Sequence, residues 1–270
     1  WLFKKIVEPA VRALPKTVRI LVYSPDGLLS RIPLEVLMEG EKFLGDRYAV
    51  YRIPSLRYVT SISELKAQPV QSGIACVDPE ISGARLPFQQ ETGQALSKLY
   101  GKGLTLLAGK ECSEGKLIAA IKNQKQPTFL HIGAHGNFYP VNAMESAIWL
   151  SPEEGSKTQA QGWNAKAMAT ADMSHIDLVT LSSCETGLTD PNVPRDVFGI
   201  ARALFFAGAK RMVAPLWAVH DQAAAEFMHA FHAAYKQNTP AVLALQQAQR
   251  SLMKTERYRH PYYWSAFVLT

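Results

Sequence analysis

Short apolar runs that alternate with longer amphipathic segments constrain the fold more than any other feature of the sequence. The runs have the length of β-strands and are bounded by turn residues, as at Ser24-Pro25-Asp26-Gly27. They predict strands at residues 19–23, 73–77, 104–107, 128–132, 178–181, 212–216 and 266–269. The amphipathic segments predict helices at residues 91–100, 114–122, 196–207, 221–236 and 241–254. This alternation is typical of an α/β protein with a mainly parallel sheet.

Two stretches that contain several proline and glycine residues interrupt the alternation. Residues 137–162 surround one short apolar run and predict a hairpin or loop at one rim of the sheet. Residues 185–195 predict a second, irregular loop. Because loops of this length usually carry function, both are expected to lie near the site.

The composition limits the kind of protein. Hydrophobic residues make up 47% of the 270 residues and charged residues 19%, as in a folded globular protein without a membrane helix. The net charge of +6 comes from scattered basic residues and carries no signature of nucleic-acid binding. Three widely spaced cysteines (Cys76, Cys112 and Cys184) favour a reducing, cytoplasmic compartment over a disulfide framework. Because the chain starts at Trp1, it is expected to be a piece of a longer protein.

Two of the predicted strands run directly into residues that can do chemistry. Residues 128–132 continue into Gly133-Ala134-His135-Gly136, and residues 178–181 continue into Ser182-Ser183-Cys184. Parallel strands bring their carboxyl ends to the same edge of a sheet, where α/β proteins place their sites. We therefore expect His135 and Cys184 to face each other as general base and nucleophile.

The glycine after the histidine fits the same chemistry. Gly136 lets the backbone turn sharply and leaves its N–H able to point at a substrate oxyanion, with the N–H of Cys184 as the second donor. The next helix is predicted only near residue 196, so the Cys184 thiolate is expected to be stabilised by His135 rather than by a helix dipole.

The remaining histidines and cysteines do not form a second site. His131 lies inside its predicted strand and is expected to be a core residue; on a strand it would lie about 13 Å from His135, too far to share a metal ion. His229 and His232 fall on a predicted helix without further ligands, and Cys76 lacks a paired base. Zinc and nucleotide motifs are absent from the sequence, so no metal and no cofactor are expected.

The chain resembles the CHAT family, caspase-like domains usually found behind TPR or similar helical repeats. The similar segments are in family order and cover most of the chain: residues 21–34, 43–56, 131–138 (HIGAHGNF), 181–187 (LSSCETG), 196–224 and 260–269 (HPYYWSAFVL). The resemblance implies a caspase-like, three-layer α/β/α fold. It places the chain in a clan with caspases, gingipains and separases, in which the two motifs carry the base and the nucleophile, here His135 and Cys184.

The resemblance also implies an organisation. Residues 1–70 correspond to a non-catalytic companion subregion and residues 71–270 to the protease subregion, within one CHAT domain; a change of composition near residues 66–72 fits this boundary. A TPR-type regulatory region is expected upstream, in a protein of bacterial type. No third catalytic residue can be assigned, since Asp177 stands at the wrong end of its strand, and in caspase-like enzymes a backbone carbonyl can orient the base.

A specificity residue is implied by resemblance to separases, which share a Leu-Trp-x-Val-x-Asp stretch and prefer a basic residue before the cut (P1). Here the stretch is residues 216–221, and Asp221 would bind an arginine or lysine side chain. Glu185, beside the nucleophile, would add to the negative electrostatic field that attracts the basic side chain. Alternatively, Asp221 caps the helix that it opens.

These observations predict a cysteine endopeptidase that cleaves protein or peptide substrates through an acyl-enzyme. Two alternatives stay open at this stage. One is a catalytically silent scaffold with the same fold, and the other is an α/β hydrolase of small thiol-reactive substrates.

Overall fold

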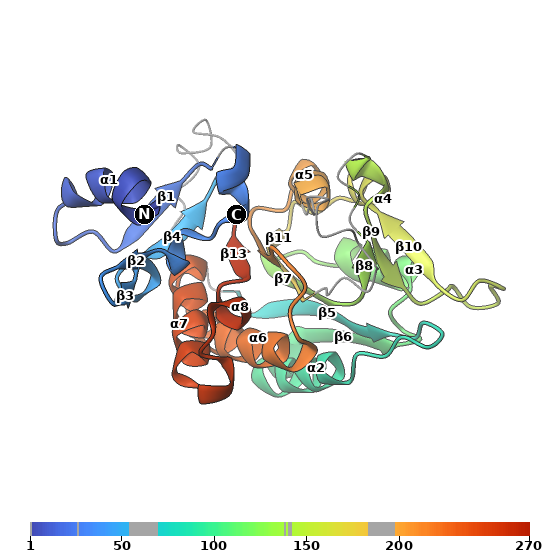
Figure 1. The fold of residues 1–270 in the computed structure, drawn as a ribbon. Coiled ribbons are helices and arrows are strands. Elements are labelled where there is room, and N and C mark those ends of the chain that lie inside the picture. The colour runs from blue at the N-terminus through green and yellow to red at the C-terminus, as the bar shows by residue number, and fades with distance from the viewer. Residues whose placement is uncertain (1, 26, 54–69, 138, 140–141, 183–197) are drawn as a thin grey trace.

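The structure, a computed structural model, describes residues 2–25, 27–53, 70–137, 139, 142–182 and 198–270. Its centre is an eight-stranded sheet with the order β1-β4-β13-β12-β11-β7-β5-β6 (Figure 1). The strands are β1 (Ile20–Tyr23), β4 (Ala49–Arg52), β5 (Ser72–Pro79), β6 (Leu104–Gly109), β7 (Thr128–Gly133), β11 (Ile176–Leu181), β12 (Met212–Pro215) and β13 (Phe267–Leu269). All seven predicted strands are present, with ends within two residues of the predicted ones.

The direction of the strands divides the sheet into two parts. β6, β5, β7, β11 and β12 are parallel, whereas β13 pairs antiparallel with β12. β4 and β1 run parallel to β13. Five carboxyl ends therefore meet at one edge, and those of β1, β4 and β13 lie at the opposite edge. The predicted, mainly parallel α/β sheet is confirmed.

Helices cover both faces of the sheet (Figure 1). One face packs against α2 (Pro87–Tyr100), α6 (Asp221–Lys236) and α7 (Ala241–Lys254), and the other against α3 (Glu114–Lys122), α4 (Ala165–Met168) and α5 (Phe198–Phe206). Alternation along β7 produces this arrangement, because Phe129 joins the first core cluster while Leu130 and Ile132 join the second. The result is three layers, as predicted.

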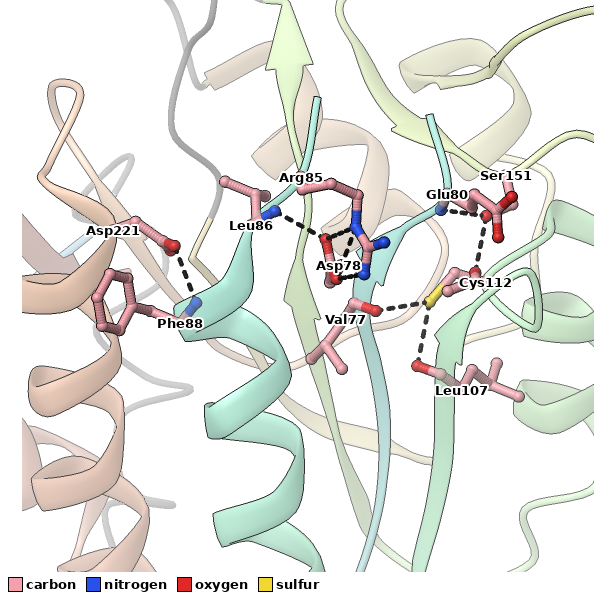
Figure 2. Close-up of polar contacts among 11 residues, drawn as sticks. Val77, Asp78, Glu80, Arg85, Leu86, Phe88, Leu107, Cys112, Ser151 and Asp221 are labelled. Atoms are coloured by element: carbon pink, nitrogen blue, oxygen red, sulfur yellow. Dashed lines mark hydrogen bonds and ion pairs between the residues drawn. The ribbon is translucent and has the colours of Figure 1, made fainter. Parts of the chain in front are cut away.

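A small sheet extends β7 at the edge with five carboxyl ends. It consists of β8 (Gly136–Asn137), β9 (Ala147–Leu150) and β10 (Gln161–Asn164), all antiparallel. The hairpin expected within residues 137–162 is thereby confirmed. Ser151, which follows β9, fixes this sheet to the larger one. Its Oγ accepts from the Glu80 N–H at 2.8 Å (Figure 2) and donates to the Gly109 carbonyl at 2.8 Å.

The N-terminal residues join the same central sheet. They form η1 (Phe3–Val7), α1 (Glu8–Arg12) and the hairpin β2 (Met38–Glu39) and β3 (Lys42–Phe43), besides β1 and β4. Near the C-terminus, α8 (Pro261–Trp264) precedes β13. The division at residue 70 stays a prediction, and the loop 185–195 lies outside the described residues. Within the described ranges, no helix is long and apolar enough to cross a membrane.

Candidate active site

β7 and β11 end side by side at the edge where the site is expected. Leu181 pairs with Ile132, and the Ser182 N–H donates to the Ile132 carbonyl at 2.8 Å. His135 follows β7 by two residues and is buried, with 5% of its surface exposed. Cys184 and Glu185, which follow β11, lie outside the described residues. The distance between His135 and Cys184 therefore stays a prediction.

The small sheet fixes the backbone of His135. The Trp149 N–H donates to the His135 carbonyl at 2.8 Å, and the next residue, Gly136, stands opposite Ile148. In an antiparallel ladder, hydrogen-bonded and non-hydrogen-bonded pairs alternate. Gly136 is therefore in a non-hydrogen-bonded pair, and its N–H points away from β9.

Asp221 reaches the same edge from β12, but it does not cap its own helix. It is the first residue of α6; the N-cap is His220, whose side chain makes no capping bond. The Asp221 carboxylate instead crosses to α2, where Oδ2 accepts from the Phe88 N–H at 3.2 Å and Oδ1 accepts from Gln89 Nε2 at 2.6 Å (Figure 2 shows the bond to Phe88). The alternative that Asp221 caps α6 is thus wrong. The physical reason is that α2 begins after Leu86, which has no side-chain acceptor for the first N–H groups.

Burial and positive charge act in opposite directions on Asp221. Desolvation raises the pKa of its half-buried carboxyl group, and this outweighs the lowering by the two hydrogen bonds and by the charges of His135 and His220. Among the described residues, no lysine or arginine forms an ion pair with Asp221.

Asp78, which the sequence reasoning missed, holds the other side of the α2 N-terminus. It stands near the end of β5 with a φ of +48° and is buried. Its Oδ1 accepts from the Leu86 N–H at 2.7 Å, and its carboxylate pairs with Arg85, whose Nε lies 3.1 Å from Oδ2 (Figure 2). The Asp-Pro that follows an apolar run was a usable signal for this residue. Two carboxylates from distant parts of the chain thus bracket the start of α2.

Most of the other histidines and cysteines named in the sequence analysis lie in the core, whereas His229 is exposed. His131 is fully buried, as predicted, and its Nδ1 lies 2.9 Å from Thr180 Oγ1, which lies 3.3 Å from His232 Nε2. Cys76 and Cys112 are buried and free. The Cys112 thiol contacts the carbonyls of Leu107 and Val77 at 3.0 and 3.3 Å (Figure 2).

Asp177 lies at the opposite edge, as predicted. It pairs with Arg211, and its Oδ2 accepts from the Tyr235 hydroxyl at 2.8 Å. The described residues contain no group of three or more His, Cys, Asp or Glu arranged to hold a metal ion.

The chain is similar to one known family and to several known proteins. A model of the CHAT domain family matches residues 1–270. Human (Homo sapiens) tetratricopeptide repeat protein 28 is 23% identical over 304 aligned residues, which cover 93% of this chain but 12% of that protein. The chain thus spans a small fraction of the length of this relative.

Solved structures share the fold at low identity. The Arg-specific cysteine proteinase gingipain R superposes with a TM-score of 0.63 at 9% identity, over 99% of this chain and 66% of that one. The complex of the Porphyromonas gingivalis RgpB pro- and mature domains gives a TM-score of 0.61 at 10% identity, over 99% and 67%. This likeness confirms the predicted caspase-like α/β fold.

Proposed function

Because this chain belongs to the CHAT family, whose fold is that of caspase-like peptidases, we propose that it is a cysteine endopeptidase in which Cys184 is the nucleophile and His135 the general base. One observation carries the proposal. His135 is buried at the carboxyl end of β7, level with the end of β11, and the sequence after β11 reaches Cys184 two residues past Ser182. In the sequence, His135 and Cys184 thus follow neighbouring parallel strands, and we propose that they come within the hydrogen-bonding reach that nucleophilic catalysis needs.

The proposed reaction follows from these positions. His135 takes the proton of the Cys184 thiol, and the thiolate attacks the scissile carbonyl. The tetrahedral intermediate expels the amine, which receives that proton from His135, and leaves a thioester on Cys184. His135 then deprotonates a water molecule that hydrolyses the thioester. The Gly136 N–H, which points away from β9, and the N–H of Cys184 are the proposed donors to the oxyanion.

We also propose a preference for a basic P1 residue, with Asp221 as its main determinant and Glu185 as a second source of negative charge. The support comes from Asp221, a half-buried carboxylate at the same sheet edge as His135 that the described lysines and arginines leave without an ion pair. A desolvated carboxylate binds guanidinium or ammonium groups through charge-assisted hydrogen bonds. Gingipain R, which is Arg-specific, shows that this fold supports such a preference.

Regulation by a TPR-type region upstream of this chain, in a cytoplasmic protein, is part of the same proposal. The support is the family match and the name of the human relative, of which this chain aligns with 12%. The substrate would then be a protein brought to the peptidase edge by that region.

Cleavage of long peptides by matched cysteine variants tests the function. Wild type and Cys112→Ser are expected to cleave at equal rates, because the Cys112 thiol is fully buried against the carbonyls of Leu107 and Val77, whereas Cys184→Ala is expected to be inactive. Equal cleavage by wild type and Cys184→Ala would refute the proposed nucleophile. Absence of cleavage by wild type, with or without a TPR-type partner, would favour the scaffold alternative.

A further inference from the structure

Gln89 occupies an unusual place for a glutamine. It lies in the first turn of α2, at the proposed active edge, and none of its surface is exposed. Glutamine is mostly an exposed residue, and buried polar groups are kept where they make specific hydrogen bonds. The neighbouring Gln90, by contrast, faces solvent.

The amide nitrogen of Gln89 holds the carboxylate of Asp221. Nε2 donates to Asp221 Oδ1 at 2.6 Å, while the Phe88 N–H donates to Oδ2 at 3.2 Å. A carboxylate only accepts, so the nitrogen end of the amide faces Asp221. Because each oxygen of the carboxylate accepts one bond from α2, the plane of the carboxylate is fixed.

The other end of the amide lies against the strand that leads to His135. A Cβ atom added to Gly133 would come within 2.5 Å of Gln89 Oε1 and 3.1 Å of its Cβ and Cδ atoms. The Gln89 side chain thus fills the space that glycine leaves at the end of β7, two residues before His135. Oε1 makes no hydrogen bond there within the described structure.

The two carboxylates at the start of α2 are held in different ways. Asp78 is paired with the guanidinium of Arg85, which neutralises its charge. Asp221 is held by a neutral amide and a backbone N–H, which fix its direction without neutralising its charge. An amide is the group expected where a carboxylate has to stay available to an incoming cation.

We propose that Gln89 is a positioning residue, which holds the charged Asp221 carboxylate toward the basic P1 side chain of the substrate. This inference rests on the proposed basic preference. Gln89 is buried behind Asp221 and acts through it rather than by contact with the substrate. Its replacement is therefore expected to change selectivity for charge more than overall binding.

Peptide binding by the Cys184→Ala protein tests this role without cleavage. Two peptides differ only at P1, where one carries arginine and the other citrulline, which has nearly the same shape but no charge. Before any further change, calorimetry is expected to show about tenfold or more preference for arginine, the contribution of one hydrogen bond to a charged group. Gln89→Met, which keeps the side-chain volume and removes the donor, is expected to bring the ratio of dissociation constants close to one. Gln90→Met is the matched control and should keep the ratio.

A second variant approaches the same contact from the strand. Gly133→Ala introduces a methyl group that collides with the Gln89 amide, and it is expected to lower the ratio as Gln89→Met does. If either variant keeps the arginine preference and circular dichroism shows an intact fold, the proposed role of Gln89 is overturned, whereas the proposed P1 specificity stands. If the Cys184→Ala protein shows no arginine preference at all, the proposed P1 specificity fails, and the role of Gln89 fails with it.

Discussion

Two aspartates at opposite edges of the central sheet, Asp177 and Asp221, are held by different kinds of partner. At the edge opposite the proposed site, Asp177 is 1% exposed and lies against Arg211 and the Tyr235 hydroxyl. At the proposed site, Asp221 is half-buried and is held by the Gln89 amide and a backbone N–H. A buried carboxylate beside a guanidinium has its charge compensated inside the protein. A carboxylate that the described residues hold through neutral donors keeps its charge for a partner from outside.

This contrast separates structural from chemical roles on one sheet. Substitutions at the opposite edge are expected to change stability without changing the cleavage rate of the folded protein. Substitutions at the proposed site are expected to change the cleavage rate more than the stability. The following variants test that separation, from the largest expected effect to the smallest.

His135→Ala is expected to lower the cleavage rate by several orders of magnitude, because partners that act as a unit fail together. Because the side chain is buried, a loss of stability is expected as well, but it should be small beside the loss of rate. Parallel measurement of kcat/KM and unfolding checks this. A large loss of stability with a proportionate loss of activity would show that His135 has a structural role and not a catalytic one.

Arg211→Met is expected to destabilise the fold by about 3–5 kcal/mol, because it leaves the Asp177 charge buried without its partner. Urea unfolding measures the loss, with the exposed neighbour Lys210→Met as control. The activity per folded molecule should not change. A stability loss no larger than that of Lys210→Met would contradict the structural role of this edge.

Asp221→Asn is expected to lower the preference for arginine or lysine at P1 by about tenfold or more, since one charge-assisted bond is lost. Stability should fall by no more than about 1 kcal/mol, because asparagine still accepts from the Phe88 N–H. A P1-scanning peptide library checks the preference, with Asp172→Asn, which removes an exposed charge, as control. An undiminished preference would reduce Asp221 to the cap of α2.

Two buried titratable groups away from the site, His131 and Glu35, are expected to contribute to the pH dependence of stability and not to the reaction. Burial lowers the pKa of His131 to about 3. Below about pH 6.5 the unfolded chain therefore binds a proton that the folded protein does not, and stability decreases as the pH is lowered. Burial raises the pKa of Glu35 to about 7, so between about pH 4.5 and 7 the folded protein binds the extra proton and stability falls as pH rises.

Unfolding at several pH values between 5 and 6.5 measures both effects. His131→Gln should lower the slope of stability against pH, and Glu35→Gln should raise it, each by up to about 1.4 kcal/mol per pH unit. Identical slopes in wild type and both variants would show that neither group changes its proton affinity on folding.

Local patterns in the sequence predicted the parts of the fold that depend on local physics. The apolar runs of β7 and β11 and the amphipathic segment of α3 are of this kind. β4 was missed because it is short and pairs only with distant strands, β1 and β13. α2 begins at Pro87, four residues before its predicted start, since its first N–H groups are satisfied by Asp78 and Asp221.

The candidate site shows the same limit. The positions of His135 and Asp221 at one edge followed from the direction of the strands. The alternation of strands and helices along the sequence predicts that these strands are parallel. The partner of Asp221 did not, because Phe88 is 133 residues away in the sequence. Gln89 gave no signal, since a glutamine in an amphipathic helix is ordinarily solvated.

The central claim is that His135 activates Cys184 and no other cysteine. A peptide with an arginine at P1 and a thiol-reactive electrophile in place of the scissile bond tests it most directly, with the adduct located by mass spectrometry of the digested protein. We predict a single adduct on Cys184, formed rapidly by wild type and at least a hundredfold more slowly by His135→Ala, because only the thiolate reacts. An adduct on Cys76 or Cys112, or labelling of Cys184 at the same rate without His135, would contradict the account.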